Sequence, residues 1–125
     1  MQKNFLFPAI IVITVVALLA GFVYLIKTKN APPPDSTMIF FYGDTCPHCQ
    51  KVEEFFVENK TEERFSFEKR EVYNSTTNAK LMTDRYKKCG ITEPKDMGVP
   101  LFWTGTECLQ GDVDIINYFE TRSEG

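Results

Sequence analysis

Two cysteines separated by two residues are the part of this sequence whose chemistry is easiest to read. They lie in the segment Cys46-Pro47-His48-Cys49. A Cys-x-x-Cys spacing is typical of a dithiol that forms and breaks a disulfide, or of half a metal site. The thiolate is the reactive form of cysteine, so the surroundings of Cys46 must lower the pKa of its thiol if the pair is to exchange disulfides. Positive charge or hydrogen-bond donors are therefore expected beside it.

A helix that begins at the motif would supply those donors. Pro47 suits the first position of a helix. Apolar residues then recur at three- and four-residue steps, namely Cys49, Val52, Phe55 and Phe56. The N-terminus of a helix carries unpaired N–H groups and the positive end of the macrodipole, and both stabilise an anion. We therefore expect Cys46 to be the attacking thiolate, Cys49 the resolving cysteine, and His48 a neighbour that stabilises the thiolate.

Metal binding is the alternative use of the same two cysteines. Structural zinc would need a second close pair of ligands, but the sequence has one histidine, and Cys89 and Cys108 stand apart from each other. Cu(I) accepts two soft thiolates, so a copper-carrier module remains open as the competing hypothesis. For the redox reading we expect no cofactor and no metal.

The elements around the motif predict an α/β domain over residues 37–122. Apolar or alternating runs predict strands at 38–42, 64–72, 99–103 and 107–109. Helical periodicity predicts helices that start at Pro47, span 77–89, and follow Gly111-Asp112. A helical crossover makes the first two strands parallel, and the terminal hairpin makes the last one antiparallel. The order β-α-β-α-β-β-α therefore predicts a mixed sheet flanked by helices.

This arrangement resembles the thioredoxin fold. The Cys46–Cys49 motif resembles the active site of DsbA-type disulfide oxidoreductases, and Gly98-Val99-Pro100 resembles the family's cis-proline loop. The resemblance implies a thiol–disulfide oxidoreductase that acts on protein thiols and disulfides, in which Val99 and Pro100 dock the substrate chain by strand addition. Two features depart from the family. Phe40 stands where a buried acid is usual, and the interval before Gly98 is too short for the inserted helical domain of DsbA-type proteins.

The two remaining cysteines have two readings. Free cysteine is often buried and inert, so Cys89 and Cys108 could be ordinary core residues. Cys89 ends a predicted helix and Cys108 lies on the outer strand of the predicted hairpin. The two could therefore meet across one face of the sheet, as a second disulfide would require.

An apolar segment precedes the domain. Residues 5–26 form a run of about 22 residues in which Thr14 is the only polar side chain, and a helix of that length spans about 33 Å. We expect a single transmembrane anchor; a cleaved signal peptide is the alternative, although its apolar region is usually only about 7–15 residues long. Three prolines, Pro32, Pro33 and Pro34, predict an extended linker over 27–36.

Charge and size limit the partners. Three of the 14 basic residues, Lys3, Lys27 and Lys29, lie near the apolar segment, so the domain is more acidic than the net charge of −3 suggests, which argues against nucleic-acid binding. We expect a monomer. Basic residues on both sides of the span leave its orientation undecided by charge. The resemblance and the two extra cysteines favour a plasma-membrane location with the domain extracytoplasmic, where secreted chains and a membrane redox partner would meet it.

Overall fold

The computed structural model describes residues 6–29 and 32–123, which fall into two compact units, Met1–Pro33 and Pro34–Gly125. The first unit contains helix α1 (Leu6–Lys29). Its segment Phe7–Lys27 has a mean hydropathy of 2.9 and is long and apolar enough to cross a membrane. Phe5, the first residue of the predicted anchor, lies outside the described residues. The helix continues through Lys27, where the sequence predicted that the linker starts.

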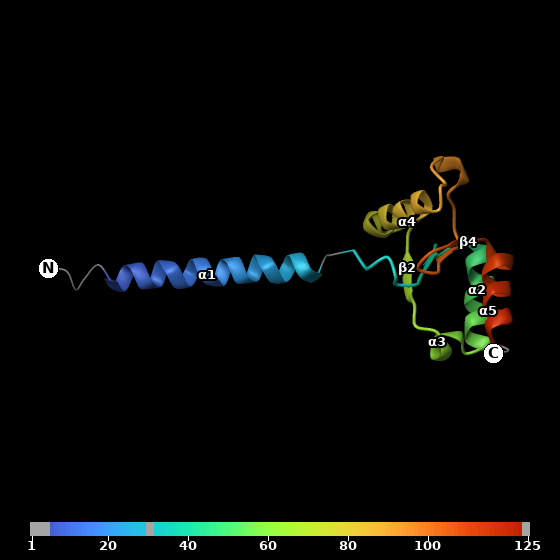
Figure 1. Ribbon diagram of the computed structural model, residues 1–125, viewed down its shortest axis with the longest axis horizontal. Coiled ribbons are helices and arrows are strands. Elements are labelled where there is room, and N and C mark those ends of the chain that lie inside the picture. The colour runs from blue at the N-terminus through green and yellow to red at the C-terminus, as the bar shows by residue number, and fades with distance from the viewer. Residues whose placement is uncertain (1–5, 30–31, 124–125) are drawn as a thin grey trace. The chain divides into compact units, whose positions relative to one another are not determined.

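The second unit is built on a mixed four-stranded sheet with the order β2-β1-β3-β4. Strand β1 (Ile39–Tyr42) pairs in parallel with β2 (Glu68–Glu71) and antiparallel with β3 (Leu101–Trp103), which pairs antiparallel with β4 (Cys108–Gln110). Helices cover both faces (Figure 1): α4 (Thr76–Lys88) covers one, and α2 (Pro47–Glu58) with α5 (Asp112–Ser123) covers the other. The mixed α/β sheet is the one that the element order predicts.

Alternation along the central strands divides the core in two. Side chains of a strand point to opposite faces in turn. Ile39 and Phe41 therefore face α4, whereas Phe40 between them faces α2 and α5. The core on the α4 side is mixed and includes Tyr86 and Trp103. The core on the other side is largely aromatic, with the ring of Phe119 in contact with five others, those of Phe56, Phe65, Phe67, Phe102 and Tyr118.

The second strand is shorter than the sequence predicts. The expected strand at 64–72 is replaced by a short helix, α3 (Thr61–Arg64), and by β2, which begins only at Glu68. Phe65 and Phe67 gave the alternating signal, but they lie before the paired residues and pack into the aromatic core. The strand itself is the charged sequence Glu-Lys-Arg-Glu at a sheet edge, where charged side chains discourage pairing with another chain. A second short element, the 3-10 helix η1 (Pro94–Asp96), was also not predicted.

Asp35 fastens the start of the second unit to α4, although the sequence assigns it to the linker. Its carboxylate pairs with Arg85 and Lys88, and its carbonyl oxygen accepts a hydrogen bond from the Trp103 indole at 2.7 Å. Arg85 is buried and its guanidinium lies 5.5 Å from the centre of the Trp103 ring. The residues just before β1 are thus held against the α4 side of the sheet.

Truncation of Phe119 should be strongly destabilising, because it opens a cavity among the rings that join α5 to the sheet. We expect Phe119→Ala to lower the free energy of unfolding by about 3–5 kcal/mol. Urea unfolding of the full chain in detergent, followed by the fluorescence of Trp103, measures this. Val113→Ala is the matched control, because Val113 lies on the same helix and is 63 % exposed. Equal stability losses in the two variants would contradict the assigned packing.

The Asp35 contacts predict a pH dependence of stability. The hydrogen bond from Lys88 is the largest influence and lowers the pKa of Asp35; partial burial opposes it, and the charges of Lys88 and Arg85 reinforce it. A carboxyl whose folded-state pKa lies below the ordinary 3.8 stabilises the fold above that pH, and the contribution disappears as the pH falls through the lowered value. Wild type should therefore be more stable than Asp35→Asn at neutral pH.

The stability difference between wild type and Asp35→Asn should shrink as the pH drops below about 4. Urea midpoints measured in a series of acidic buffers test this. Asp84 is an exposed acid on α4, the helix that carries Arg85 and Lys88. The variant Asp84→Asn therefore serves as the control and should not reproduce the pattern. A difference that stays constant down to the acid limit would contradict the assignment.

Candidate functional site

Cys46 and Cys49 form a disulfide at the N-terminus of α2, with their Cα atoms 5.2 Å apart. Cys46 is the N-cap residue with an extended backbone (φ −86°, ψ 112°), and Pro47 occupies the first helical position as predicted. The Cys46 Sγ accepts a hydrogen bond from the Cys49 N–H at 3.2 Å. The sulfur thus takes the place of the serine or aspartate oxygen that commonly caps a helix. The Gln50 N–H donates to the Cys46 carbonyl oxygen at 3.1 Å, so both the side chain and the backbone of Cys46 cap the first turn of the helix.

The two cysteines are both buried, and Cys46 is the more exposed of the pair. Cys46 is 6 % exposed, whereas Cys49 is 1 % exposed and faces the sheet with Val52 and Phe56. An incoming thiol or disulfide therefore reaches Cys46 first, and the helix N-terminus would stabilise the thiolate that is released there. The geometry suits the roles of attacking and resolving cysteine that the sequence predicts.

The backbone before β3 lies beside this pair. Phe41 of β1 is opposite Leu101 of β3, so the residues just after β1 and just before β3 meet at the same end of these two central strands. The Val99 carbonyl oxygen is 3.8 Å from the Cys46 Sγ, and the Val99–Pro100 peptide bond is cis, as the resemblance implied. Val99 is half-buried and precedes the first paired residue of its strand. Its backbone is thus placed next to the reactive sulfur.

His48 pairs with Asp112, a residue that the sequence marks only as the start of the last helix. The His48 Nδ1 lies 3.1 Å from Asp112 Oδ1 at the start of α5, and Lys51 Nζ is 3.5 Å from the other carboxylate oxygen. Partial burial, the largest influence, raises the pKa of Asp112, but the His48 hydrogen bond and the charges of His48 and Lys51 outweigh it, so the net shift is downward. The Asp112 carboxylate therefore stays ionised near neutral pH and is the partner of the His48 Nδ1.

Gly111 lets α5 begin at this edge of the sheet. Its φ is +89°, a conformation that favours glycine, and its N–H donates to the Pro100 carbonyl at 3.0 Å. This turn directs the next residue, Asp112, toward the start of α2. The Gly-Asp pair was the available signal in the sequence, but only the folded chain shows that Asp112 contacts His48.

Tyr73 is a second residue beside the motif that sequence reasoning missed. It follows β2 at the same sheet edge and is 56 % exposed. A Cβ at Gly43, which follows β1, would lie 2.3 Å from the Tyr73 ring, so a larger residue there would force this ring to move. The side chain of Asn74 donates to Asp44 at 3.0 Å, which ties the same two loops together. An aromatic side chain thus borders the segment that leads into Cys46.

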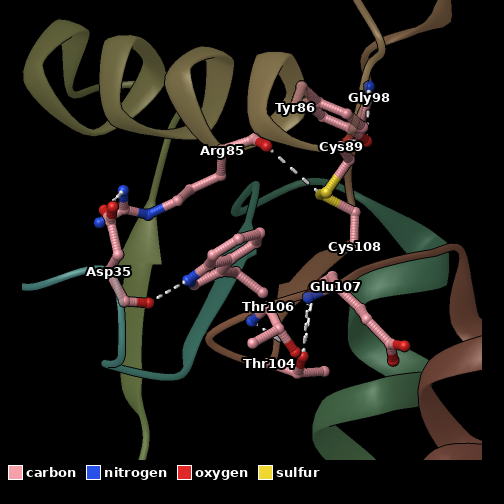
Figure 2. Close-up of a disulfide and its surroundings, with 10 residues drawn as sticks. Asp35, Arg85, Tyr86, Cys89, Gly98, Thr104, Thr106, Glu107 and Cys108 are labelled. Carbon is pink, nitrogen blue, oxygen red and sulfur yellow. Dashed lines mark hydrogen bonds and ion pairs between the residues drawn. A yellow bond between two sulfur atoms is a disulfide. The ribbon is translucent and has the colours of Figure 1, made fainter.

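Cys89 and Cys108 form a second disulfide, with Cα atoms 6.1 Å apart, between the end of α4 and β4 (Figure 2). Both residues are half-buried against the α4-side core. The Cys108 Sγ lies 3.5 Å from the carbonyl oxygen of Arg85. The cysteines that the sequence left with two readings are thus joined across one face of the sheet.

The surroundings of Cys49 are apolar. Phe40, at the position where the resemblance implies an acid, is fully buried and packs edge-on against Phe56. Glu53, the next acid along the helix, pairs with Lys69 of β2 at 2.9 Å. Over residues 7–27 and 32–122, no aspartate, glutamate, histidine or lysine side chain is buried. A proton that leaves Cys49 therefore has to pass to solvent or to a partner.

No cluster of three or more histidine, cysteine, aspartate or glutamate side chains suited to a metal occurs in the described part of the chain. The comparisons with known proteins add no assignment, since neither the protein-family models nor the curated proteins gave a match. The site therefore has to be interpreted from its own geometry: a dithiol at a helix N-terminus, a bound histidine and an adjacent strand end.

After reduction, iodoacetamide should label Cys46 before Cys49, because Cys46 is more exposed and its sulfur is at the helix N-terminus. The rate for Cys46, followed by peptide mass spectrometry on the full chain in detergent, should reach half of its plateau below pH 8.5, the approximate pKa of a free cysteine. Repeating the series on Cys49→Ser isolates Cys46. Faster labelling of Cys49, or a Cys46 midpoint at about 8.5, would be the contrary result.

Proposed function

We propose that the chain is a membrane-tethered thiol–disulfide oxidoreductase with a thioredoxin-like fold. One observation carries the proposal: the Cys46 sulfur caps α2, where it accepts the Cys49 N–H, and at the same time lies 3.8 Å from the backbone of Val99. Both features serve an exchange reaction, in which a thiolate must form and an extended chain must dock.

The exchange is a pair of substitutions at sulfur. The Cys46 thiolate attacks a substrate disulfide, one substrate thiolate leaves, and a mixed disulfide between Cys46 and the substrate remains. The Cys49 thiolate then attacks the Cys46 sulfur, the second substrate thiolate leaves, and the Cys46–Cys49 bond forms. Two electrons pass from the chain to the substrate, and solvent protonates the released thiolates. In reverse, the same steps oxidise a substrate dithiol and reduce the Cys46–Cys49 pair.

His48 bears on the direction of the exchange. A hydrogen-bond donor near Cys46, charged or neutral, stabilises the thiolate, and thus the reduced pair, over the disulfide; a pair stabilised in its reduced form is a stronger oxidant. His48 follows Cys46 by two residues at the first turn of α2 and is held by Asp112. Oxidation or isomerisation of protein thiols is therefore the proposed direction, with a membrane redox partner to reset the pair.

The substrates proposed are extended protein segments with exposed thiols or disulfides. Val99 and Pro100 would dock such a segment by strand addition before β3. The fold assignment is supported by the sheet order β2-β1-β3-β4 and by helices on both faces. We propose that the chain acts as a monomer with no bound cofactor.

The proposed location is the extracytoplasmic side of a plasma membrane. Helix α1 carries exposed apolar side chains along its length, including Phe7, Leu18 and Ile26, and a bilayer is the solvent that suits them. The second disulfide, Cys89–Cys108, supports an oxidising compartment, because such bonds are rare in the cytosol.

The mixed disulfide offers a direct test. Reduced Cys49→Ser should attack insulin disulfides and accumulate a covalent adduct, because no resolving thiolate remains, whereas Cys46→Ser should show no more adduct than a blank. Non-reducing gels of the full chain in detergent detect the product.

Two results would contradict the proposal. One is a Cys46→Ser variant that exchanges disulfides as fast as wild type. The other is a wild-type chain, purified under reducing conditions, that holds one copper ion on its two motif cysteines and has no exchange activity, which is the behaviour of a metal carrier.

A further inference from the structure

The side chain of Tyr86 binds both backbone groups of Gly98. Tyr86 is fully buried on α4, and its hydroxyl donates to the Gly98 carbonyl at 2.7 Å and accepts from the Gly98 N–H at 3.2 Å. Figure 2 shows the ring of Tyr86 beside Cys89, with Gly98 at the hydroxyl end. Gly98 is the residue before Val99. Tyr86 lies on the opposite side of the sheet from α2, and its hydroxyl thus binds the backbone that leads to Val99, beside Cys46.

The segment that Tyr86 holds lies outside the sheet. Helix η1 ends at Asp96 with Met97 as its C-cap, and strand β3 begins at Leu101, so residues 98–100 connect the two. Pro100 is fixed from the other side, where its carbonyl accepts the Gly111 N–H at 3.0 Å. Val99 therefore sits between two anchored neighbours, with its carbonyl oxygen 3.8 Å from the Cys46 sulfur. Loss of the anchor at Gly98 would release one side of this short span.

The second disulfide holds the turn of α4 that carries Tyr86. Cys89, three residues after Tyr86, is bonded to Cys108 of β4, and its N–H donates to the Tyr86 carbonyl at 3.0 Å. Arg85, the residue before Tyr86, lies against Trp103 and pairs with Asp35. Contacts of Arg85 and of Cys89, which lie before and after Tyr86 in the sequence, thus set the position of the phenol relative to β3.

The phenol stays protonated over the physiological range. Burial, the largest influence, raises the pKa of Tyr86, and the hydrogen bond with Gly98 lowers it by less. The hydroxyl therefore keeps the proton that it donates to the Gly98 carbonyl. The anchor does not depend on pH under the conditions in which thiolates exchange.

We propose that Tyr86 is a positioning residue for protein substrates: through Gly98 it fixes the Val99 backbone where an extended chain pairs beside Cys46, and the Cys89–Cys108 disulfide keeps it in place. The inference rests on the proposed function and adds a substrate class to it. Extended polypeptides need the ordered Val99 backbone, whereas small disulfides need only the Cys46 sulfur. The reactivity of the dithiol itself is unaffected by Tyr86.

Tyr86→Phe removes the hydroxyl and keeps the ring that fills the core. For the full chain in detergent, we expect kcat/KM for a reduced, unfolded protein substrate to fall about tenfold, the scale of one or two lost hydrogen bonds. The fall should come mainly from KM, and the exchange rate with oxidised glutathione should stay within about twofold of wild type. Tyr118→Phe is the matched control, since it deletes a hydroxyl from a half-buried tyrosine that packs in the aromatic core on the other face of the sheet.

A second variant tests whether a general folding defect explains the loss. Cys89→Ala with Cys108→Ala keeps the Tyr86 hydroxyl but loosens its helix turn, and it should show the same selective loss for protein substrates. Trp103 fluorescence verifies that each variant is folded at the assay temperature.

The outcomes separate the inference from the function. An unchanged KM for protein substrates in Tyr86→Phe, or an equal loss with glutathione, would overturn the role of Tyr86. A wild-type chain that exchanges with glutathione and with proteins leaves the proposed function standing in either case, whereas a wild-type chain that exchanges with neither removes that function itself.

Discussion

The pairing of β1 with β3, in which Phe41 lies opposite Leu101, is the constraint on which the rest of the site depends. It brings the end of one strand and the start of another to the same edge of the sheet. Cys46 follows the first and Val99 precedes the second, so residues far apart in the sequence come within 3.8 Å. The same edge receives Asp112, because β4 ends beside the start of β3 and Gly111 turns the chain. The register of β1 and β3 thus places both the Cys46–Cys49 pair and the Val99 backbone at this end of the sheet.

The two faces of the sheet support different parts of the site. The aromatic face packs α2 and α5 together, and this fixes Cys46, His48 and Asp112 relative to one another. The opposite face packs α4, whose Tyr86 binds Gly98, the residue before Val99, and whose C-terminal end is held by the second disulfide. Rigid packing on both faces means that neither half of the site has to be ordered when a substrate binds. The Asp35 ion pairs extend this support to the residues that enter β1.

The sequence predicted most elements because their signals are local. The start of α2 at Pro47 follows from helix-start chemistry, and the buried strands follow from short apolar runs. The strand expected at 64–72 was wrong in extent because Phe65 and Phe67 are extended core residues that precede the ladder, while the ladder itself is a charged edge. The contacts of Asp112, Tyr73 and Tyr86 were not predictable, since each joins elements that are distant in sequence. Local sequence patterns do not indicate which loops the register of the sheet brings together.

The central claim is that Cys46 and Cys49 form a reversible redox couple and not a structural bond. Equilibration of the full chain in detergent with glutathione and dithiothreitol buffers, followed by alkylation and peptide mapping of these two cysteines, measures the couple directly. We expect a two-electron midpoint above about −270 mV, the potential of thioredoxin, because the helix N-terminus and His48 stabilise the reduced form. A pair that remains oxidised below about −300 mV, as structural disulfides do, would contradict the account.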